Sequence, residues 1–348
     1  MHRSMRPIRF LGIAAALSAL ALASQAQPAV PPLGGIWPAG GGFVFKDKPK
    51  KARQAVSGIA CAPNAQRRNV CLLAVDEGVS MPFAQVGDGR LQPDGHSIAL
   101  GRDGDELDAE GAATDGAYFY VTGSHAVKRQ SCAANPASRH VLRFRRDAAT
   151  GWPAQPPDLR DATHLPALLA TLPELAAATA PGVCLGRGGI DIEGLAVRAG
   201  RLFFGLRGPT AQDAAFIVSV DAGALFEGGD AKPRVHQVNL GAGRGLRDLL
   251  AVPDGILLLA GPDDDQRNAD LPWTVLLWDD AETPAPKPPR PPKPLATLDL
   301  RGVAKRECDK EIKPEAFTLL DASPGHYRLL VLSDGLCDGG ALAFDIPH

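Results

Sequence analysis

The sequence has no large excess of charge of either sign. Lys and Arg together number 37 and Asp and Glu number 39, which gives a formal net charge of −2. Proteins that bind nucleic acid usually carry a strong basic bias, so the balance argues against a nucleic-acid partner. It also gives no support for an acidic disordered chain. We therefore expect a folded protein whose partners are of another kind.

Aromatic residues are scarce as well, at 5% of the chain, although 45% of all residues are hydrophobic. A core built from this composition must consist mostly of aliphatic side chains. The length of 348 residues does not divide the chain by itself, because all-β folds often run past roughly 200 residues as one domain.

Long apolar runs are missing after the N-terminus. The one such run covers residues 10–23, follows a basic start at residues 2–9, and precedes Ser24-Gln25-Ala26, where small residues stand at the positions a signal peptidase reads. We predict a signal peptide over residues 1–26 and a mature chain, residues 27–348, that is periplasmic or secreted and has no membrane span. An N-terminal anchor is the alternative, but the run is short for a hydrocarbon layer about 30 Å thick.

All six cysteines lie in the predicted mature chain. An even number of cysteines in an oxidising compartment indicates three disulfides. The spacing suggests the pairs Cys61–Cys71, Cys132–Cys184 and Cys308–Cys337, although six cysteines allow fifteen pairings. A metal site built on thiols finds no support, because no C-x-x-C or Cys/His cluster is present.

One pattern recurs along the chain: a small or acidic residue, an apolar run, a turn, a second apolar run and a Gly-containing turn. Taking Ser57, Glu110, Glu193, Asp248 and Glu315 as equivalent gives steps of 53, 83, 55 and 67 residues. The runs are short, rich in Val, Ile, Leu and Phe, and bounded by Gly, Asp and Pro, as strands are. A period of this size suits four-stranded propeller blades. We predict an all-β fold, a β-propeller of about five blades, with six blades, an open β-sandwich or two smaller β domains as alternatives.

Two long steps between repeats carry insertions. Residues 163–180 are rich in Leu and Ala and should hold a short helix, broken near Pro173. Residues 283–294 are dense in proline and should form an extended surface loop. The last repeat lacks a fourth strand, and residues 41–45 have strand character without a blade of their own. We expect that segment to close the ring and so protect its open edges.

The repeat geometry predicts where a functional site lies. Antiparallel neighbours place the start of a first strand beside the end of a second strand, so these positions should gather around one opening of the channel. The expected mouth holds Glu110, Glu193, Asp248 and Glu315 from the first strands, and Glu77, Arg207 and Asp334 from the second strands, with Ser124 and His125 just beyond. Converging carboxylates must take up protons, bind a cation or be neutralised by a basic residue. A structural role for each carboxylate in capping turns or bonding the next blade remains the alternative.

These residues suggest two functions. In the first, the mouth binds a small-molecule ligand, a peptide or a cation, and Glu110, Glu193, Asp248 and Glu315 supply the oxygen ligands that Ca²⁺ prefers. In the second, the protein is a hydrolase of phosphate esters or lactones, with Glu193 and Glu110 as general base and Arg207 holding an anionic group. Neither G-x-S-x-G nor H-E-x-x-H occurs, and the acidic segments 103–108 and 263–265 are expected to be solvated turns. We expect a monomer.

Two segments carry a resemblance to a known family. Residues 189–196 (GIDIEGLA) with residues 204–209 (FGLRGP) look like the central signature of the bacterial domain-of-unknown-function 3616 family, and residues 108–111 (DAEG) with 121–125 (VTGSH) look like its earlier repeat. The resemblance extends from about Val56 to Asp345 and implies a propeller, without implying a reaction. A shorter similarity, through E-G-[IL]-A, is to the esterase-like phytase propellers.

Overall fold

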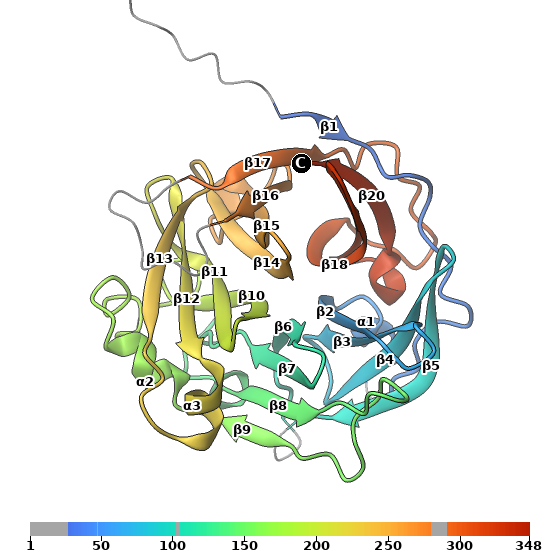
Figure 1. Cartoon of the computed structure of the whole chain (residues 1–348). Helices are drawn as coiled ribbons and strands as arrows, with labels where there is room; N and C mark the ends of the chain where they lie inside the picture. The colour runs from blue at the N-terminus through green and yellow to red at the C-terminus, as the bar shows by residue number, and fades with distance from the viewer. Residues whose placement is uncertain (1–26, 47, 102–104, 280–290) are drawn as a thin grey trace, which may run out of the picture.

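The chain forms a ring of five β-sheets arranged as the blades of a propeller (Figure 1). The computed structural model describes residues 27–46, 48–101, 105–279 and 291–348. The predicted fold class and blade count are therefore confirmed. The predicted signal peptide, residues 1–26, lies outside the described residues.

Blades 1 to 3 each hold four antiparallel strands in chain order. Blade 1 contains β2 (Val56–Pro63), β3 (Asn69–Val75), β4 (Ser80–Gly87) and β5 (Arg90–Ala99). Blade 2 contains β6 (Ala109–Thr114), β7 (Tyr118–Gly123), β8 (Val141–Arg145) and β9 (Arg160–Ala162). Blade 3 contains β10 (Asp191–Arg198), β11 (Arg201–Ala211), β12 (Ala214–Asp221) and β13 (Arg234–Asn239).

Blades 4 and 5 are joined by the N-terminal segment. Blade 4 contains β14 (Arg244–Val252), β15 (Gly255–Pro262), β16 (Thr274–Trp278) and β17 (Lys293–Leu298), with β1 (Ala29–Val30) parallel to β17 at its outer edge. Blade 5 has three strands, β18 (Lys313–Ser323), β19 (His326–Asp334) and β20 (Leu342–Pro347). The helices are short: α1 (Pro49–Ala52), α2 (Leu165–Ala170), α3 (Ala222–Glu227), and the 3₁₀ turns η1 (Pro136–Ser138), η2 (Gln266–Asn268) and η3 (Cys337–Gly340).

The hydrophobic core lies between neighbouring blades. Five clusters of buried side chains fill the five interfaces around the ring, and most of their members are Val, Leu, Ile and Ala. The few aromatic rings lie at these interfaces. Phe83 of blade 1 meets Phe119 of blade 2 with ring centroids 5.7 Å apart, and Phe203 of blade 3 meets Trp278 of blade 4 at 6.1 Å. The largely aliphatic core agrees with the composition.

The ring closes through a different segment from the one expected. After β1, the N–H group of Leu33 donates to the carbonyl of Ala343 in β20 and that of Trp37 donates to the carbonyl of Ala341 just before β20, so the chain near residues 33–37 covers the edge of blade 5. The prediction that residues 41–45 form this strand is wrong. Positive φ angles at Gly40 (57°) and Gly42 (77°) interrupt the extended backbone there, as glycine readily allows.

The three suggested disulfides, Cys61–Cys71, Cys132–Cys184 and Cys308–Cys337, are all present. The helix predicted within residues 163–180 is α2, which ends at Ala170, before Pro173. Of the Pro-rich segment, residues 283–290 lie outside the described residues, and Lys293 and Pro294 already belong to β17. None of the helices in the described part of the chain is long and apolar enough to cross a membrane.

Candidate functional site: a charged cavity at the channel mouth

Every first strand carries a β-bulge at the same place. The register between first and second strands shifts across one residue in each blade, and that residue is Ser57, Glu110, Glu193, Arg247 or Glu315. A bulged residue is left out of the ladder, so a bulge can re-aim its side chain, and bulges are common next to functional sites. The bulges thus define a ring of equivalent positions, one in each blade.

The member from blade 4 is Arg247, so the prediction of Asp248 in the mouth is wrong by one residue. Asp248 is buried, and its carboxylate accepts hydrogen bonds from the backbone N–H groups of Leu249 (2.8 Å) and of Phe317 in blade 5 (2.9 Å). Asp248 therefore joins blades 4 and 5, which is the structural role considered as the alternative for each carboxylate. Burial raises the pKa of Asp248 well above its usual range.

Asp248 also explains the glycine of the recurring Glu-Gly pair. In blades 1 to 3 the residue after the bulge is glycine: Gly58, Gly111 and Gly194. A Cβ on Gly194 would lie 2.9 Å from the Leu249 Cγ and 3.0 Å from the backbone carbon of Asp248. The glycine is needed because the first strand of the next blade packs directly against it. The Glu-Gly pair therefore reflects two features of the fold: the glutamate is the bulged residue, and the glycine allows the inner strands of neighbouring blades to pack closely.

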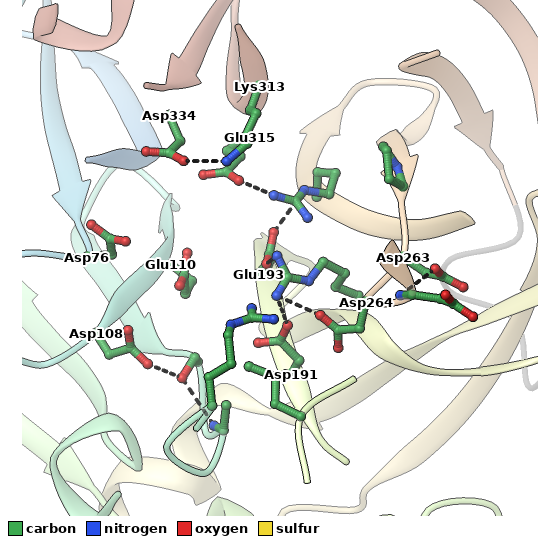
Figure 2. A pocket seen from close by; sticks show the side chains of 18 of the residues that line it. Asp76, Asp108, Glu110, Asp191, Glu193, Asp263, Asp264, Lys313, Glu315 and Asp334 are labelled. Carbon is green, nitrogen blue, oxygen red and sulfur yellow. Dashed lines mark hydrogen bonds and ion pairs between the residues drawn. The ribbon is translucent and has the colours of Figure 1, made fainter. Parts of the chain in front are cut away.

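The bulged side chains from blades 2 to 5 line a cavity of about 780 Å³ at one end of the channel (Figure 2). Eleven carboxyl side chains and five basic side chains line it. The acidic residues are Asp76, Asp108, Glu110, Asp191, Glu193, Asp263, Asp264, Asp265, Glu311, Glu315 and Asp334, and the basic ones are Lys128, Arg129, Arg207, Arg247 and Lys313. Of the residues predicted for the mouth, the structure brings together Ser124, Glu110, Glu193, Arg207, Glu315 and Asp334, and it does not place Asp248, Glu77 or His125 with them.

Arg207 holds three carboxylates on one side of the cavity. Its guanidinium lies 2.7 Å from Asp191 Oδ2, 2.5 Å from Glu193 Oε1 and 2.7 Å from Asp264 Oδ1. Burial alone would lower the pKa of Arg207, but Asp191, Glu193 and Asp264 raise it well above its usual range, so the side chain stays charged. Burial and the nearby Asp191 carboxylate raise the pKa of Asp264 to about 7, although Arg207 opposes the shift.

Arg247 continues this network to blade 5. Its Nε lies 3.0 Å from Glu193 Oε2, and its Nη2 contacts Glu315 Oε1. Both oxygens of Glu193 are therefore ion-paired, one with each arginine. Burial nevertheless raises the pKa of Glu193 to about 7, because Arg207 and Arg247 offset only part of the cost of desolvation and Glu315 adds repulsion. Near Glu315, Lys313 Nζ lies 3.6 Å from Asp334 Oδ2.

The opposite side of the cavity has carboxylates without a cation. Figure 2 draws no interaction from Asp76 or Glu110 to the other side chains shown. Asp76 Oδ1 is buried and accepts no hydrogen bond. Burial raises the pKa of Asp76 well above its usual range, and Asp334, Glu315 and Asp108 add to the shift. Burial is also the largest cause of the strongly raised pKa of Glu110, and the negative charges of Glu193 and Asp108 raise that pKa further. Asp108 accepts a hydrogen bond from the Ser124 hydroxyl.

Two residues expected from the second strands lie elsewhere. Glu77 points to the surface and pairs with Lys48 and Lys51, while its neighbour Asp76 lines the cavity. Ser124 lines the mouth as expected, but His125 lies in a second cavity. Successive side chains of a strand point to opposite faces, so only one residue of the pair Asp76–Glu77, and one of the pair Ser124–His125, is expected to face the mouth. The sequence does not show which one, because it does not show where this alternation is interrupted.

Sequence reasoning missed Asp76, Asp108, Asp191, Asp264, Arg247 and Lys313. Asp264 lies in the acidic segment 263–265, which was expected to be only a solvated turn. Its position offered a signal, because it is the second residue after the second strand of blade 4, and Asp76 is the first residue after that of blade 1. The expectation that residues at the ends of second strands face the mouth therefore holds for Asp76 and Asp264 as well as for the residues named from the repeats.

The predicted metal ligands do not converge on one point. Within the described ranges, Cys308, Asp309 and Cys337 are the one group of three whose potential ligand atoms all lie within 4.8 Å of one another, and its two sulfur atoms are joined in a disulfide. Of the expected ligands, Glu110, Glu193 and Glu315 line the mouth, and Asp248 does not. Ca²⁺ binding there remains a prediction.

A family model described as "Protein of unknown function (DUF3616)" matches residues 86–146 and 159–339, which is more than half of the chain. The chain belongs to the DUF3616 family. The match includes the glycine-flanked bulges of blades 2 and 3 and the Arg207 segment, so the cavity described above is built largely from the part of the chain that this DUF3616 model covers.

Solved structures with a similar outline include several enzymes of carbohydrate chemistry. A GH43 β-1,3-galactosidase matches with a TM-score of 0.46 and 10% identity, covering 90% of this chain and 94% of that one. A glycosyl hydrolase from Bacteroides ovatus matches with a TM-score of 0.40 and 14% identity, covering 92% and 94%. The mannose phosphorylase MPT-4 from Leishmania mexicana matches with a TM-score of 0.39 and 10% identity, covering 92% and 88%. These superpositions are too loose to transfer an activity. No functionally curated protein matches the chain.

Proposed function

We propose that the mouth binds a small ligand that carries positive charge. The observation that supports this is the uneven division of the cavity: Arg207 and Arg247 form ion pairs with carboxylates of blades 3 to 5, whereas Asp76 and Glu110 form no ion pair with any described residue. Partly buried carboxylates without an ion pair are costly to keep charged, and the pKa values of Asp76 and Glu110 are raised well above their usual range, which favours the protonated forms. A ligand with N–H donors replaces those protons and restores the charge balance.

An organic ammonium fits the cavity better than a bare metal ion. A directly bound Ca²⁺ needs six to eight oxygen atoms at about 2.3–2.6 Å, and so needs carboxylates gathered around one point. The mouth carboxylates described above are instead spread around a space of about 780 Å³. A diamine extends across such a space and places one ammonium group near Glu110 and another near Asp76.

Isothermal titration calorimetry with 1,4-diaminobutane tests this proposal, and calcium chloride serves as the second arm. We expect the diamine to bind and the Glu110→Gln and Asp76→Asn substitutions each to weaken binding about tenfold, since a charged hydrogen bond contributes roughly 1.5–3 kcal/mol. The matched controls are Glu174→Gln and Asp88→Asn, at exposed positions away from the cavity. Binding that is equal in all four variants, or absent in the wild type for both cations, would refute the proposal.

A hydrolase at the same mouth is the second candidate. The raised pKa of Glu110 and the pKa of about 7 for Glu193 favour it, because general acid–base catalysis often uses carboxyl groups whose pKa values are raised by burial. The ion pairs of both Glu193 oxygens and the three carboxylates on Arg207 count against it, since neither group is free to act on a substrate. Turnover of a panel of aryl phosphates and lactones that Glu110→Gln abolishes would favour this candidate over simple binding.

We also propose that the protein is exported and works in the periplasm or outside the cell. Three disulfides are compatible with an oxidising compartment. N-terminal sequencing of protein from the periplasmic fraction should give Gln27 as the first residue. Protein that remains in the cytoplasm with its N-terminus uncleaved would contradict the proposal.

A further inference from the structure

A second cavity of about 410 Å³ lies outside the mouth, between blade 2 and the insertion that precedes blade 3. One wall comes from the loop after β7, which carries His125. The other comes from α2, through Leu169, and from the turns at residues 178–183. The Cys132–Cys184 disulfide links the two walls and so holds the cavity in shape.

Most of the lining of this cavity is apolar, and it contains a single charged side chain, Arg139. No carboxylate lines the cavity, and no ion pair joins Arg139 to any residue of the described chain. Its Nε is buried and makes no hydrogen bond. Arg139 is half-buried, and a charged group held against an apolar wall is normally paired with an anion.

His125 adds a second unsatisfied group. It is 5% exposed, and neither ring nitrogen has a hydrogen-bond partner. Leaving a buried donor or acceptor without a partner costs about 1–3 kcal/mol. Its backbone also has a φ of 55°, a left-handed conformation that is uncommon outside glycine. Burial, helped by the charges of Arg139 and His140, lowers the pKa of His125 to about 3, so the ring is neutral and has one N–H to donate.

We propose that this second cavity binds a small apolar molecule with one carboxylate group. The carboxylate accepts hydrogen bonds from Arg139 and from His125, and the apolar part lies against Leu169 and Ile190. The volume falls within the roughly 300–1,000 Å³ that small-molecule pockets span. Val127 lines both cavities, but the acidic mouth repels an anion. The two cavities therefore take ligands of opposite charge, and this proposal does not depend on the function proposed for the mouth.

Calorimetric titration of the purified protein with sodium octanoate tests the proposal. Octan-1-ol is the matched ligand, with the same chain and no charge. We expect octanoate to bind at least about tenfold more tightly than octan-1-ol, because an ionised acceptor roughly doubles the strength of a hydrogen bond. Arg139→Gln should remove this preference, whereas Arg145→Gln, at an exposed position on β8, should leave it unchanged.

A second pair of variants keeps the test independent of the arginine. Ala178 lines the cavity and is half-buried, while its neighbour Ala177 is exposed and lies outside it. Ala178→Trp should fill the cavity and abolish octanoate binding, and Ala177→Trp should not. The proposal is overturned if octanoate does not bind, if octan-1-ol binds equally well, or if both tryptophan variants still bind octanoate as the wild type does.

Discussion

The burial of Glu193 should make the stability of the protein depend on pH in a specific way. The pKa of Glu193 is raised to about 7 in the folded protein, against 4.5 for the free side chain. Below about pH 4.5 the group is protonated in both the folded and the unfolded chain and changes nothing. As the pH rises towards 7 the unfolded chain loses this proton first, so the folded state becomes relatively less stable.

The size of this effect follows from the shift. Each pKa unit corresponds to about 1.4 kcal/mol, so Glu193 lowers the free energy of unfolding by about 3 kcal/mol between pH 4.5 and neutral pH. Two buried histidines oppose it. Burial lowers the pKa of His125 to about 3 and of His236 to about 4, so both stabilise the folded state increasingly as the pH rises to about 6.5. The wild-type profile alone therefore does not isolate the carboxyl group.

The difference between wild type and Glu193→Gln isolates it, because the histidines are common to both proteins. Thermal unfolding followed by intrinsic fluorescence between pH 5 and 8 should show the variant gaining on the wild type by about 3 kcal/mol, or about 4 °C in Tm for a chain of this length. The exposed control Glu174→Gln should show no such trend. A difference between wild type and Glu193→Gln that is constant with pH, or that grows towards low pH, would refute the proposed electrostatics of the mouth.

Two further predictions concern the packing of the inner strands, both measured by urea unfolding. Gly194→Ala should destabilise the protein by about 1–3 kcal/mol, because the new Cβ overlaps blade 4. The control Gly223→Ala, within α3, should be neutral or slightly stabilising. An equal loss of stability in the two variants would contradict this prediction. Asp248→Ala should lower the free energy of unfolding by at least about 1–3 kcal/mol, because the Phe317 N–H in blade 5 loses its acceptor in blade 4. A variant of unchanged stability would show that Asp248 does not join the two blades.

The fold could be predicted from the sequence because its signals are local. Short β-branched and aliphatic runs bounded by Gly, Asp and Pro mark the strands, and their repetition marks the blades. The third run of the second repeat, Val141–Arg145, has the same bounds as β8. The three disulfide pairs also followed from spacing, because each joins cysteines within one blade or across one insertion.

The second cavity, in contrast, gave no signal in the sequence. Its lining comes from the loop after β7, from α2 and from the residues before β10, which are brought together by tertiary packing and by a disulfide that spans 52 residues. His125 looked like part of the mouth because it directly follows Ser124. A turn of the backbone at His125, with its positive φ, sends the two neighbouring side chains into different cavities.

The error of one residue in blade 4 has the largest consequence for the site. Arg247 and Asp248 are both polar, so the apolar pattern around them does not show which one occupies the bulge. With Asp248 there, the ring would hold four carboxylates and call for a cation at its centre. With Arg247 there, carboxylates of blades 3 to 5 are ion-paired within the protein, whereas Asp76 and Glu110, from blades 1 and 2, form no ion pair with any described residue. We therefore expect the cationic ligand proposed for the mouth to bind beside Asp76 and Glu110, because the carboxylates on the other side already have arginine partners.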